Sequence, residues 1–306
     1  MENNATPECI AEESRVKRPR IFGRSDGRRI KTLPPISRVS PYIMKTRCGA
    51  SNYISDSVDI RNMEKYIKLK RAEGLINFGA LHVFIAAYIR TVSQRPGINR
   101  FISGQKIFAR NNIEIAMTIK KNMLLESPDT VIKVIFRPEA TADEVYAVMN
   151  DSIEKEKGSM DLDSSFDRLT GVLNFIPGLF LKFAVWFLGL LDYFGMLPKK
   201  LLRLSPFHGS LVITSIGSLG IPPIYHHLYD FGNIPILWAF GAKRAQRELS
   251  KSGTVEIRKY IDYQLVCDER ICDGFYYASA LKYIKKLLKN PFCLSDPPER
   301  VIPDID

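Results

Sequence analysis

The sequence predicts an α+β domain in which strands and helices form layers. Segments with the period-two alternation of strands and segments with helical spacing follow one another along the 306-residue chain. They do so without the regular strand–helix–strand order of a doubly wound parallel sheet. No internal repeat, P-loop or dinucleotide-binding glycine motif follows a predicted strand. The composition, 45% hydrophobic and 25% charged, supplies one large core or two smaller ones.

The two ends of the chain are expected to be tails, with the domain proper between residues 38 and 293. Residues 1–37 form a basic flexible tail in this interpretation, and residues 294–306 a C-terminal one. Residues 15–31 hold eight basic residues against Asp26 alone, a net charge of 8 − 1 = +7. Such a segment suits nucleic acid or an anionic membrane. A nucleic-acid partner is not favoured, because the rest of the chain shows no recognition module.

Helices are indicated by their end signals. Asp59 caps a helix that runs to about Glu73, where Gly74 ends it. A second apolar helix follows from Gly79 to Val92. Thr141 and Glu144 form a capping box ahead of a third, and the last helix runs from Gly274 to about Leu288.

Strands are indicated by apolar alternation and β-branched residues. An extended segment is expected over 42–60 and a hairpin over 101–119 that turns at Ser103-Gly104. Further strands are expected at residues 131–136, 210–216, 234–240 and 254–267.

An aromatic-rich insert is expected between residues 164 and 204. Its apolar stretch, 172–197, is interrupted by Pro177, Lys182 and Asp192. A spanning helix needs about 20 predominantly apolar residues, so this stretch favours a buried or interfacial helix pair, and peripheral membrane contact through it stays open. The first twenty residues contain no apolar run and the five cysteines form no close pair, so a cytoplasmic protein with reduced thiols is expected.

Three segments stand out as carriers of chemistry. The first, Arg95–Phe101, is a turn that leads into the hairpin, and the second, Ile213–Gly220, is a strand that runs into a glycine-rich turn with exposed hydroxyls. The third, Val266–Gly274, joins a long strand to the last helix.

In this order the three segments resemble the catalytic domain of the dihydrolipoamide acyltransferases of 2-oxo acid dehydrogenase complexes, which share their fold with chloramphenicol acetyltransferase. The resemblance covers residues 38–293. It implies a chloramphenicol-acetyltransferase-like two-layer sandwich, a mixed sheet with helices on one side, carrying an apolar helical insert. It also implies a homotrimer, or a multiple of one, with each active site on a subunit boundary.

The family's third segment reads Asp-His-Arg-x-x-Asp/Asn-Gly, and its histidine takes the thiol proton of CoA or of a dihydrolipoyl arm. A hydroxyl of the second segment hydrogen-bonds the oxyanion. By resemblance, Thr214 falls at that hydroxyl, with Ser215 as its fallback, and Asp273 is the carboxylate that holds the loop through an arginine, for which Arg38 is the guess. The remaining matches in the third segment, with loop-holding roles, are Asp268, Arg270 and Gly274.

The chain departs from the family at the histidine, where it has Glu269. Imidazole has an ordinary pKa near 6.5 and a glutamate side chain one near 4.3, so a glutamate is the weaker base unless burial raises its pKa. His226 and His227 are substitute bases, about a dozen residues after Thr214, and their alternative role is ordinary packing. His208 is a weaker candidate, and His82 is expected in the core.

The leading hypothesis is an acyltransferase that moves an acyl group from a thioester, expected to be acyl-CoA, to an unidentified acceptor through a tetrahedral intermediate. The alternative is a non-catalytic trimeric module that binds an acyl thioester or a partner chain and has lost its base. The chain lacks a lipoyl domain within its 306 residues. CoA thioester enters as substrate, with no bound cofactor and no metal, since no His, Cys and Asp residues have ligand spacing.

Overall fold

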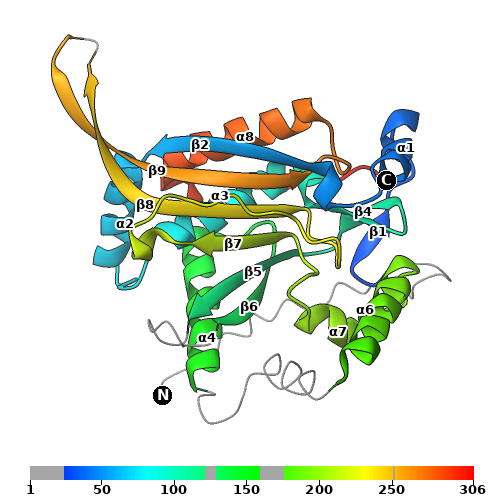
Figure 1. Ribbon diagram of the computed structural model, residues 1–306. Helices are drawn as coiled ribbons and strands as arrows, with labels where there is room; N and C mark the ends of the chain where they lie inside the picture. The colour runs from blue at the N-terminus through cyan, green and yellow to red at the C-terminus, as the bar shows by residue number, and fades with distance from the viewer. Residues whose placement is uncertain (1–23, 121–128, 159–175, 251) are drawn as a thin grey trace, which may run out of the picture.

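The computed structural model describes residues 24–120, 129–158, 176–250 and 252–306. Its centre is a six-stranded mixed sheet in the order β2-β9-β8-β7-β5-β6 (Figure 1). The neighbours β5 and β7, and β7 and β8, are parallel, and the other pairs are antiparallel. The strands are β2 (Ser51–Asp59), β5 (Ile113–Lys120), β6 (Asp129–Phe136), β7 (Leu211–Ser215), β8 (Ile236–Leu249) and β9 (Val255–Asp268).

One face of this sheet is covered by helices, which confirms the predicted α+β sandwich. Phe84 of the central helix stacks on Phe240 of β8, with ring centroids 4.4 Å apart, and also contacts Trp238. The apolar residues of this layer and of the sheet face beneath it form one core. The covering helices are α2 (Arg61–Ala72), α3 (Ala80–Gln94), α4 (Ala142–Gly158) and α8 (Gly274–Lys289).

The start of α4 shows why the helices begin where the sequence predicts. Thr141 N donates to Glu144 Oε2 at 2.8 Å, and Glu144 N donates to Thr141 Oγ1 at 3.3 Å. These two bonds are the predicted capping box, and they satisfy backbone donors that have no partner within the helix.

The opposite face of the sheet carries an irregular segment, residues 220–235. Leu228 of this segment packs against Leu237 of β8 and Val266 of β9. Its early part is fixed by the bond from Ala242 N to Ile221 O, and its later part by Asp230, which accepts from the backbone of Arg47 and Cys48. The segment therefore crosses the sheet from the end of β7 toward the turn η1 (Cys48–Ala50), which precedes β2.

A second, three-stranded sheet has the order β1-β4-β3, with β1 (Gly27–Arg29), β3 (Arg100–Ser103) and β4 (Lys106–Arg110). The predicted hairpin is therefore shorter than expected, because β5 leaves it for the large sheet. Its turn lies at Gly104 and Gln105, both with positive φ (54° and 57°). The turn η2 (Pro96–Asn99) leads into β3.

The N-terminal tail was expected to run to residue 37, and this boundary is wrong. Residues 24–37 belong to the folded domain, because Arg24 and Ile30 are buried and β1 pairs with β4. Residues 1–23 lie outside the described residues. The helix α1 (Pro35–Ile43) also replaces the first part of the extended segment expected over 42–60, and strand structure starts only at Ser51.

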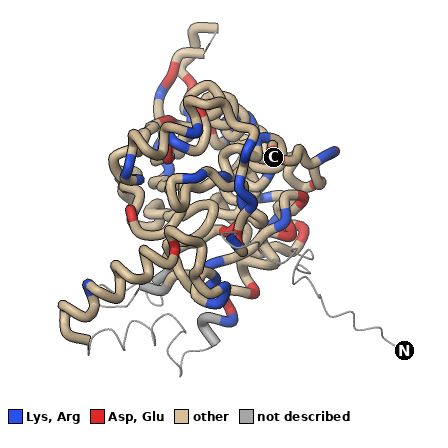
Figure 2. Tube along the Cα trace, turned by 90° about the vertical axis from the view of Figure 1, so that its right-hand side faces the viewer, with Lys and Arg blue, Asp and Glu red and all other residues tan. Residues whose placement is uncertain are grey.

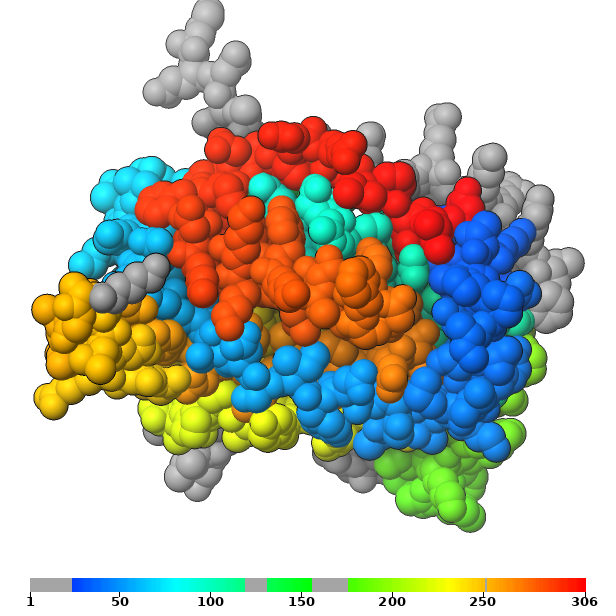
Figure 3. Space-filling view, turned by 90° about the horizontal axis from the view of Figure 1, so that it is seen from above, coloured from blue at the N-terminus to red at the C-terminus, as the bar shows by residue number. Residues whose placement is uncertain are grey.

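The expected C-terminal tail also lies against the body. After η4 (Pro291–Leu294), Ile302 N donates to Ser93 O, and Arg100 forms an ion pair with Asp304 at 2.5 Å. Thr32 N donates to Asp306 O at 2.8 Å, so the last residues lie beside the start of the described chain (Figure 3).

Two features project from this body. The outer halves of β8 and β9, beyond the irregularity between Phe240 and Lys243, form an exposed two-stranded arm (Figure 1). The described part of the expected insert contains α6 (Gly178–Tyr193) and α7 (Lys199–Leu204). Among the described residues, no helix is both long and apolar enough to cross a membrane.

Candidate active site

The loop between β9 and α8 is fixed by a buried ion pair. Arg270 Nε and Nη2 donate to the two carboxylate oxygens of Asp268, each at 2.8 Å, and both side chains are almost fully buried. A bidentate pair of this kind sets both the distance and the orientation of the two groups. Arg270 Nη1 also donates to Met44 O at 3.1 Å, and Arg47 Nε lies 3.6 Å from Asp268 Oδ2. The sequence did not single out Arg47, because its partner is distant in the chain.

Glu269 lies between these two buried residues and points the other way. Its backbone N–H donates to Ala50 O at 2.9 Å, which continues the pairing of β9 with the segment before β2. Its side chain is exposed in the single chain, and within the described residues its carboxylate has no hydrogen bond or ion pair. The loop therefore presents an unpaired carboxylate on a rigid support.

Asp273 and Gly274 form the start of α8. Asp273 is the N-cap residue, and its carboxylate accepts from Tyr276 N at 2.7 Å. The expected contact between Asp273 and Arg38 is absent from the described chain, because α1 turns the Arg38 side chain into solvent. Arg38 is therefore not the arginine that holds this loop; Arg270 and Arg47 hold it through Asp268.

The first and third sequence segments meet at the start of α8. Gly97 N donates to Tyr276 Oη at 2.9 Å, and a Cβ at Gly97 would lie 2.8 Å from the Tyr276 ring. The glycine is therefore needed for close approach. Arg100 Nη1 donates to Ile271 O at 3.5 Å, and Tyr277 Oη donates to Asp268 O at 2.9 Å. Arg100, which belongs to the first segment, and Tyr277 support the loop, and neither was given a role from the sequence.

The second segment ends the strand β7 at a different place. Thr214 is half-buried, and by alternation it shares the face of Val212, which is the face opposite the helices. Ser215 is exposed, and the turn η3 (Gly217–Leu219) follows. A Cβ at Gly217 would lie 2.8 Å from Gly241 O, so the glycine lets this turn pack directly on β8.

Thr214 and Glu269 are far apart within one chain. The register pairs Thr214 with Ala239, and Ala239 with Gln264, which precedes Glu269 by five residues. Five residues of strand span about 17 Å, and two strand spacings about 10 Å, so the two residues are separated by about 20 Å. A single protomer does not bring them together.

His226 and His227 lie in the irregular segment on the face opposite the helices. His226 is half-buried, and burial together with the nearby His227 lowers its pKa. Its Nε2 is buried and has no hydrogen-bond partner among the described residues. His227 is exposed, and its ring packs on Tyr229 with centroids 5.4 Å apart. Neither histidine hydrogen-bonds to Thr214 or Glu269 within the described chain.

The other two histidines have structural contacts. His82 is buried, accepts from Gly79 N at 3.0 Å, and burial lowers its pKa to about 4. This confirms its predicted place in the core. His208 is also buried, and its ring lies between Ser205 Oγ at 2.7 Å and Asp192 Oδ1 at 3.4 Å. Burial lowers the pKa of His208, which favours the neutral ring.

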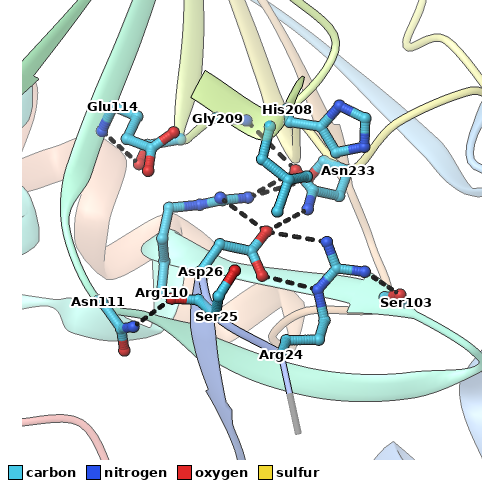
Figure 4. A network of polar contacts seen from close by, with 12 residues as sticks. Arg24, Ser25, Asp26, Ser103, Arg110, Asn111, Glu114, His208, Gly209 and Asn233 are labelled. Atoms are coloured by element: carbon cyan, nitrogen blue, oxygen red, sulfur yellow. Dashed lines mark hydrogen bonds and ion pairs between the residues drawn. The ribbon is translucent and has the colours of Figure 1, made fainter. Parts of the chain in front are cut away.

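His208 belongs to a buried polar network (Figure 4). Arg24 pairs with Asp26 through Nε at 2.7 Å and with Asp192 through Nη1 at 2.8 Å. Arg110, which has no exposed side-chain surface, lies 3.7 Å from Asp26 and donates to Asn233 Oδ1 at 2.8 Å. This network joins the start of the described chain, β4, the end of α6 and the segment before β8.

The cysteines beside Glu269 are not poised to react. Cys267 is buried, and burial raises its thiol pKa to about 12. Burial also raises the pKa of Cys272. Both therefore stay protonated near neutral pH. In the described part of the chain, no group of three or more His, Cys, Asp or Glu side chains is arranged to hold a metal ion.

No protein family model and no curated protein sequence matches the chain. Solved structures do match its fold. A probable dihydrolipoamide acetyltransferase from Listeria monocytogenes aligns with a TM-score of 0.53 at 16% identity, over 85% of this chain and 94% of that one. The Azotobacter vinelandii dihydrolipoamide acetyltransferase aligns with a TM-score of 0.56 at 13% identity, over 87% and 93%.

A chloramphenicol acetyltransferase aligns with a TM-score of 0.51 at 9% identity, over 86% of this chain and 100% of that one. These alignments each cover between 85% and 87% of the chain. At such low identity they establish the architecture and not the chemistry. The chain therefore has the fold shared by the dihydrolipoamide acetyltransferase catalytic domains and chloramphenicol acetyltransferase, as its sequence predicts.

Proposed function

We propose that this protein is an acyltransferase that acts as an oligomer, with Glu269 of one protomer and Thr214 of its neighbour lining each active site. The observation that carries this proposal is the rigid loop that presents Glu269, supported by the buried Asp268–Arg270 pair, within an acyltransferase fold. An unpaired carboxylate on a fixed loop can accept a proton from a bound acceptor.

The position of the loop supports the same proposal. The catalytic mechanism of the Azotobacter vinelandii enzyme has been investigated through a serine, a histidine and an asparagine, the last two separated by four positions. Glu269 and Asp273 have the same separation here, and both lie just before α8. By this spacing Glu269 takes the place of the histidine and Asp273 that of the asparagine.

The proposed reaction begins at the acceptor, whose proton passes to the Glu269 carboxylate as its nucleophilic atom attacks the carbonyl carbon of an acyl-CoA thioester. Thr214 Oγ1 donates a hydrogen bond to the oxyanion of the tetrahedral intermediate. The carbon–sulfur bond then breaks, the CoA thiolate leaves, and it takes the proton from Glu269. His226 is the alternative base, since its buried Nε2 has no partner in the described chain.

The separation of the two residues supports the oligomer in this proposal. Because Thr214 and Glu269 are about 20 Å apart within a protomer, only a neighbouring copy can bring the second residue to the first. The pyruvate dehydrogenase structure with which this chain also aligns, at a TM-score of 0.51, is the cubic core of a multienzyme complex. A homotrimer or a multiple of it fits this proposal.

Thiol release from acyl-CoAs of increasing chain length tests the function directly. We expect Thr214→Ala to lower turnover about 100-fold, because one oxyanion donor contributes roughly that much. Glu269→Gln should abolish turnover while CoA binding persists. Ser218→Ala removes an exposed hydroxyl from the neighbouring turn and serves as the control. Unchanged turnover in Thr214→Ala would exclude that residue from the mechanism.

The second candidate is a non-catalytic module that binds an acyl thioester. It is favoured by the carboxylate at position 269, because an ordinary glutamate is a weaker base than imidazole. Glu269→His separates the two candidates. If the wild-type protein binds acyl-CoA without releasing thiol, and Glu269→His gains turnover, the protein is a module whose fold still supports catalysis.

A further inference from the structure

The helix α6 presents an apolar face to solvent. Six large apolar side chains lie within one arc of the helix at helical spacing, with Leu179 79% and Trp186 59% exposed. Large contiguous apolar patches on a monomer mark an interaction site. The residues of this face, called here the α6 face, are Leu179, Phe180, Phe183, Trp186, Phe187 and Leu190.

The contacts of α6 with the body are concentrated at its C-terminal end. Asp192 is buried against Arg24, and Tyr193 Oη donates to Gln105 Oε1 at 3.0 Å. A Cβ at Gly104 would lie 2.5 Å from Tyr193 O, so the hairpin turn approaches the end of the helix closely. The N-terminal part of α6 extends away from the body, toward the lower left in Figure 2. The α6 face is therefore accessible to a flat partner.

The charges of this region have one sign. Residues 176–204 contain four basic residues and one acidic residue, a net charge of 4 − 1 = +3. The acidic residue, Asp192, is buried and paired with Arg24. Lys182, Lys199 and Lys200 are exposed, and within the described chain none of them takes part in an ion pair. Within residues 176–204 the exposed charge is therefore wholly basic and suits an anionic partner.

The length of α6 determines how a membrane would meet it. Its 16 residues span about 24 Å, less than the hydrocarbon core of about 30 Å. A helix with tryptophan and phenylalanine on one face and flanking lysines lies in the plane of the membrane interface. A second copy of the chain docked symmetrically through the same face fits less well, because two basic regions would be brought together.

We propose that the α6 face, with Lys182, Lys199 and Lys200 beside it, docks on the surface of an anionic lipid bilayer. The apolar side chains enter the boundary between headgroups and acyl chains, and the lysines contact the anionic headgroups. The proposal is independent of the acyltransferase function, since it rests on the exposure and charge of α6 alone.

The test uses the full chain and sedimentation with vesicles of phosphatidylcholine alone or with added phosphatidylserine. Binding is expected to the anionic vesicles, and to weaken with added salt. The double variant Phe183→Ser and Trp186→Ser should lower the partition coefficient about 100-fold, since each large side chain contributes a factor of about 10 or more on burial. Phe275→Ser removes an even more exposed phenylalanine, from α8, and this variant should bind as the wild type does.

The chain also contains its own optical probe. Its two tryptophans are Trp186 on the α6 face and Trp238 in the core, so a blue shift of emission on vesicle binding reports Trp186. Trp186→Phe should bind and lose the shift. Failure to bind anionic vesicles overturns the proposal. Binding that the double variant leaves unchanged also overturns it and assigns the contact to another basic region. Loss of self-association in the double variant, without vesicle binding, makes the α6 face a contact between copies.

Discussion

At the scale of single residues, prediction and structure differ most in the environment of the basic residues near the N-terminus. Local charge indicated a solvated arm, yet Arg24 is buried and bonded to Asp26 and to Asp192, which is 168 positions away. A sequence pattern shows charge density but not the distant carboxylate that compensates it. For the same reason the sequence did not indicate a role for Arg47, whose partners Asp268 and Asp230 also come from distant segments.

Asp26 makes this network sensitive to acid. Burial alone would raise its pKa, but the hydrogen bond and ion pair with Arg24 and the charge of Arg110 outweigh burial and lower the pKa to about 2. Because the pKa is lower in the folded state than in the unfolded state, the carboxylate stabilises the fold above about pH 4 and loses that effect as the pH falls toward 2. Its contribution is about 2 kcal/mol.

We expect the free energy of unfolding of Asp26→Asn to be lower than that of the wild type at pH 5, and the difference to shrink between pH 4 and pH 2. Urea unfolding at several pH values measures this difference. Asp306→Asn, at an exposed ion pair with Arg28, should differ little from the wild type throughout. A pH-independent difference for Asp26→Asn would contradict the assigned linkage.

The place of the third segment in the fold was predicted, because a motif fixes spacing along the chain. The sequence placed Asp268, Glu269 and Arg270 between a strand and the last helix, and the structure has them there. The sequence does not give the orientation of each side chain. The helix α1 was not predicted, and its direction determines where Arg38 points, so the predicted contact of Arg38 with Asp273 is wrong.

At the scale of elements, helices with end signals were predicted and elements without them were missed. The capping box at Thr141 lies at an observed helix start, and the Asp59 carboxylate accepts from Arg61 N at 3.0 Å at the start of α2. The helix α1 begins without a side-chain cap and contains Pro41, so its sequence resembles a loop. The outer half of β8, beyond residue 240, was missed because its exposed side chains show little apolar alternation, whereas the strand expected over 254–267 covers nearly all of β9.

The contact between η2 and α8 gives a prediction at this scale. Gly97→Ala would place a Cβ 2.8 Å from the Tyr276 ring and so push the first turn of α8 away. We expect a loss of about 1–3 kcal/mol in unfolding free energy, the range for overpacking. Gly189→Ala is the matched control, because a Cβ there has no neighbour within 4 Å and should stabilise α6 slightly. Equal stability of the two variants would contradict the close contact.

At the scale of the whole molecule, the architecture was predictable from three motifs in series. Each motif alone is too short to identify a fold. Their order and spacing together match one fold, the α+β sandwich that the structure has. The assembly was not derivable from residue pattern, because nothing in the pattern records how far Thr214 is from Glu269 within one chain. Only the strand register gives that distance.

Complementation between protomers tests the shared site. Thr214→Ala alone should keep about 1% of the wild-type turnover and Glu269→Gln none, while a refolded or co-expressed mixture should recover about a quarter of the wild-type activity per protomer. In random assembly, a quarter of the sites combine an intact Thr214 from one chain with an intact Glu269 from the other. Thiol release measures the recovery, and the absence of any recovery would place both residues in one protomer or remove one of them from the site.

The separation of these two residues along the sheet has a further consequence for how such an enzyme behaves in dilute solution. If each site is completed only by a neighbour, a lone chain folds but cannot turn over substrate, so specific activity rises with protein concentration and follows the law of mass action. The concentration of the chain then determines which fraction of it is active, without any effector.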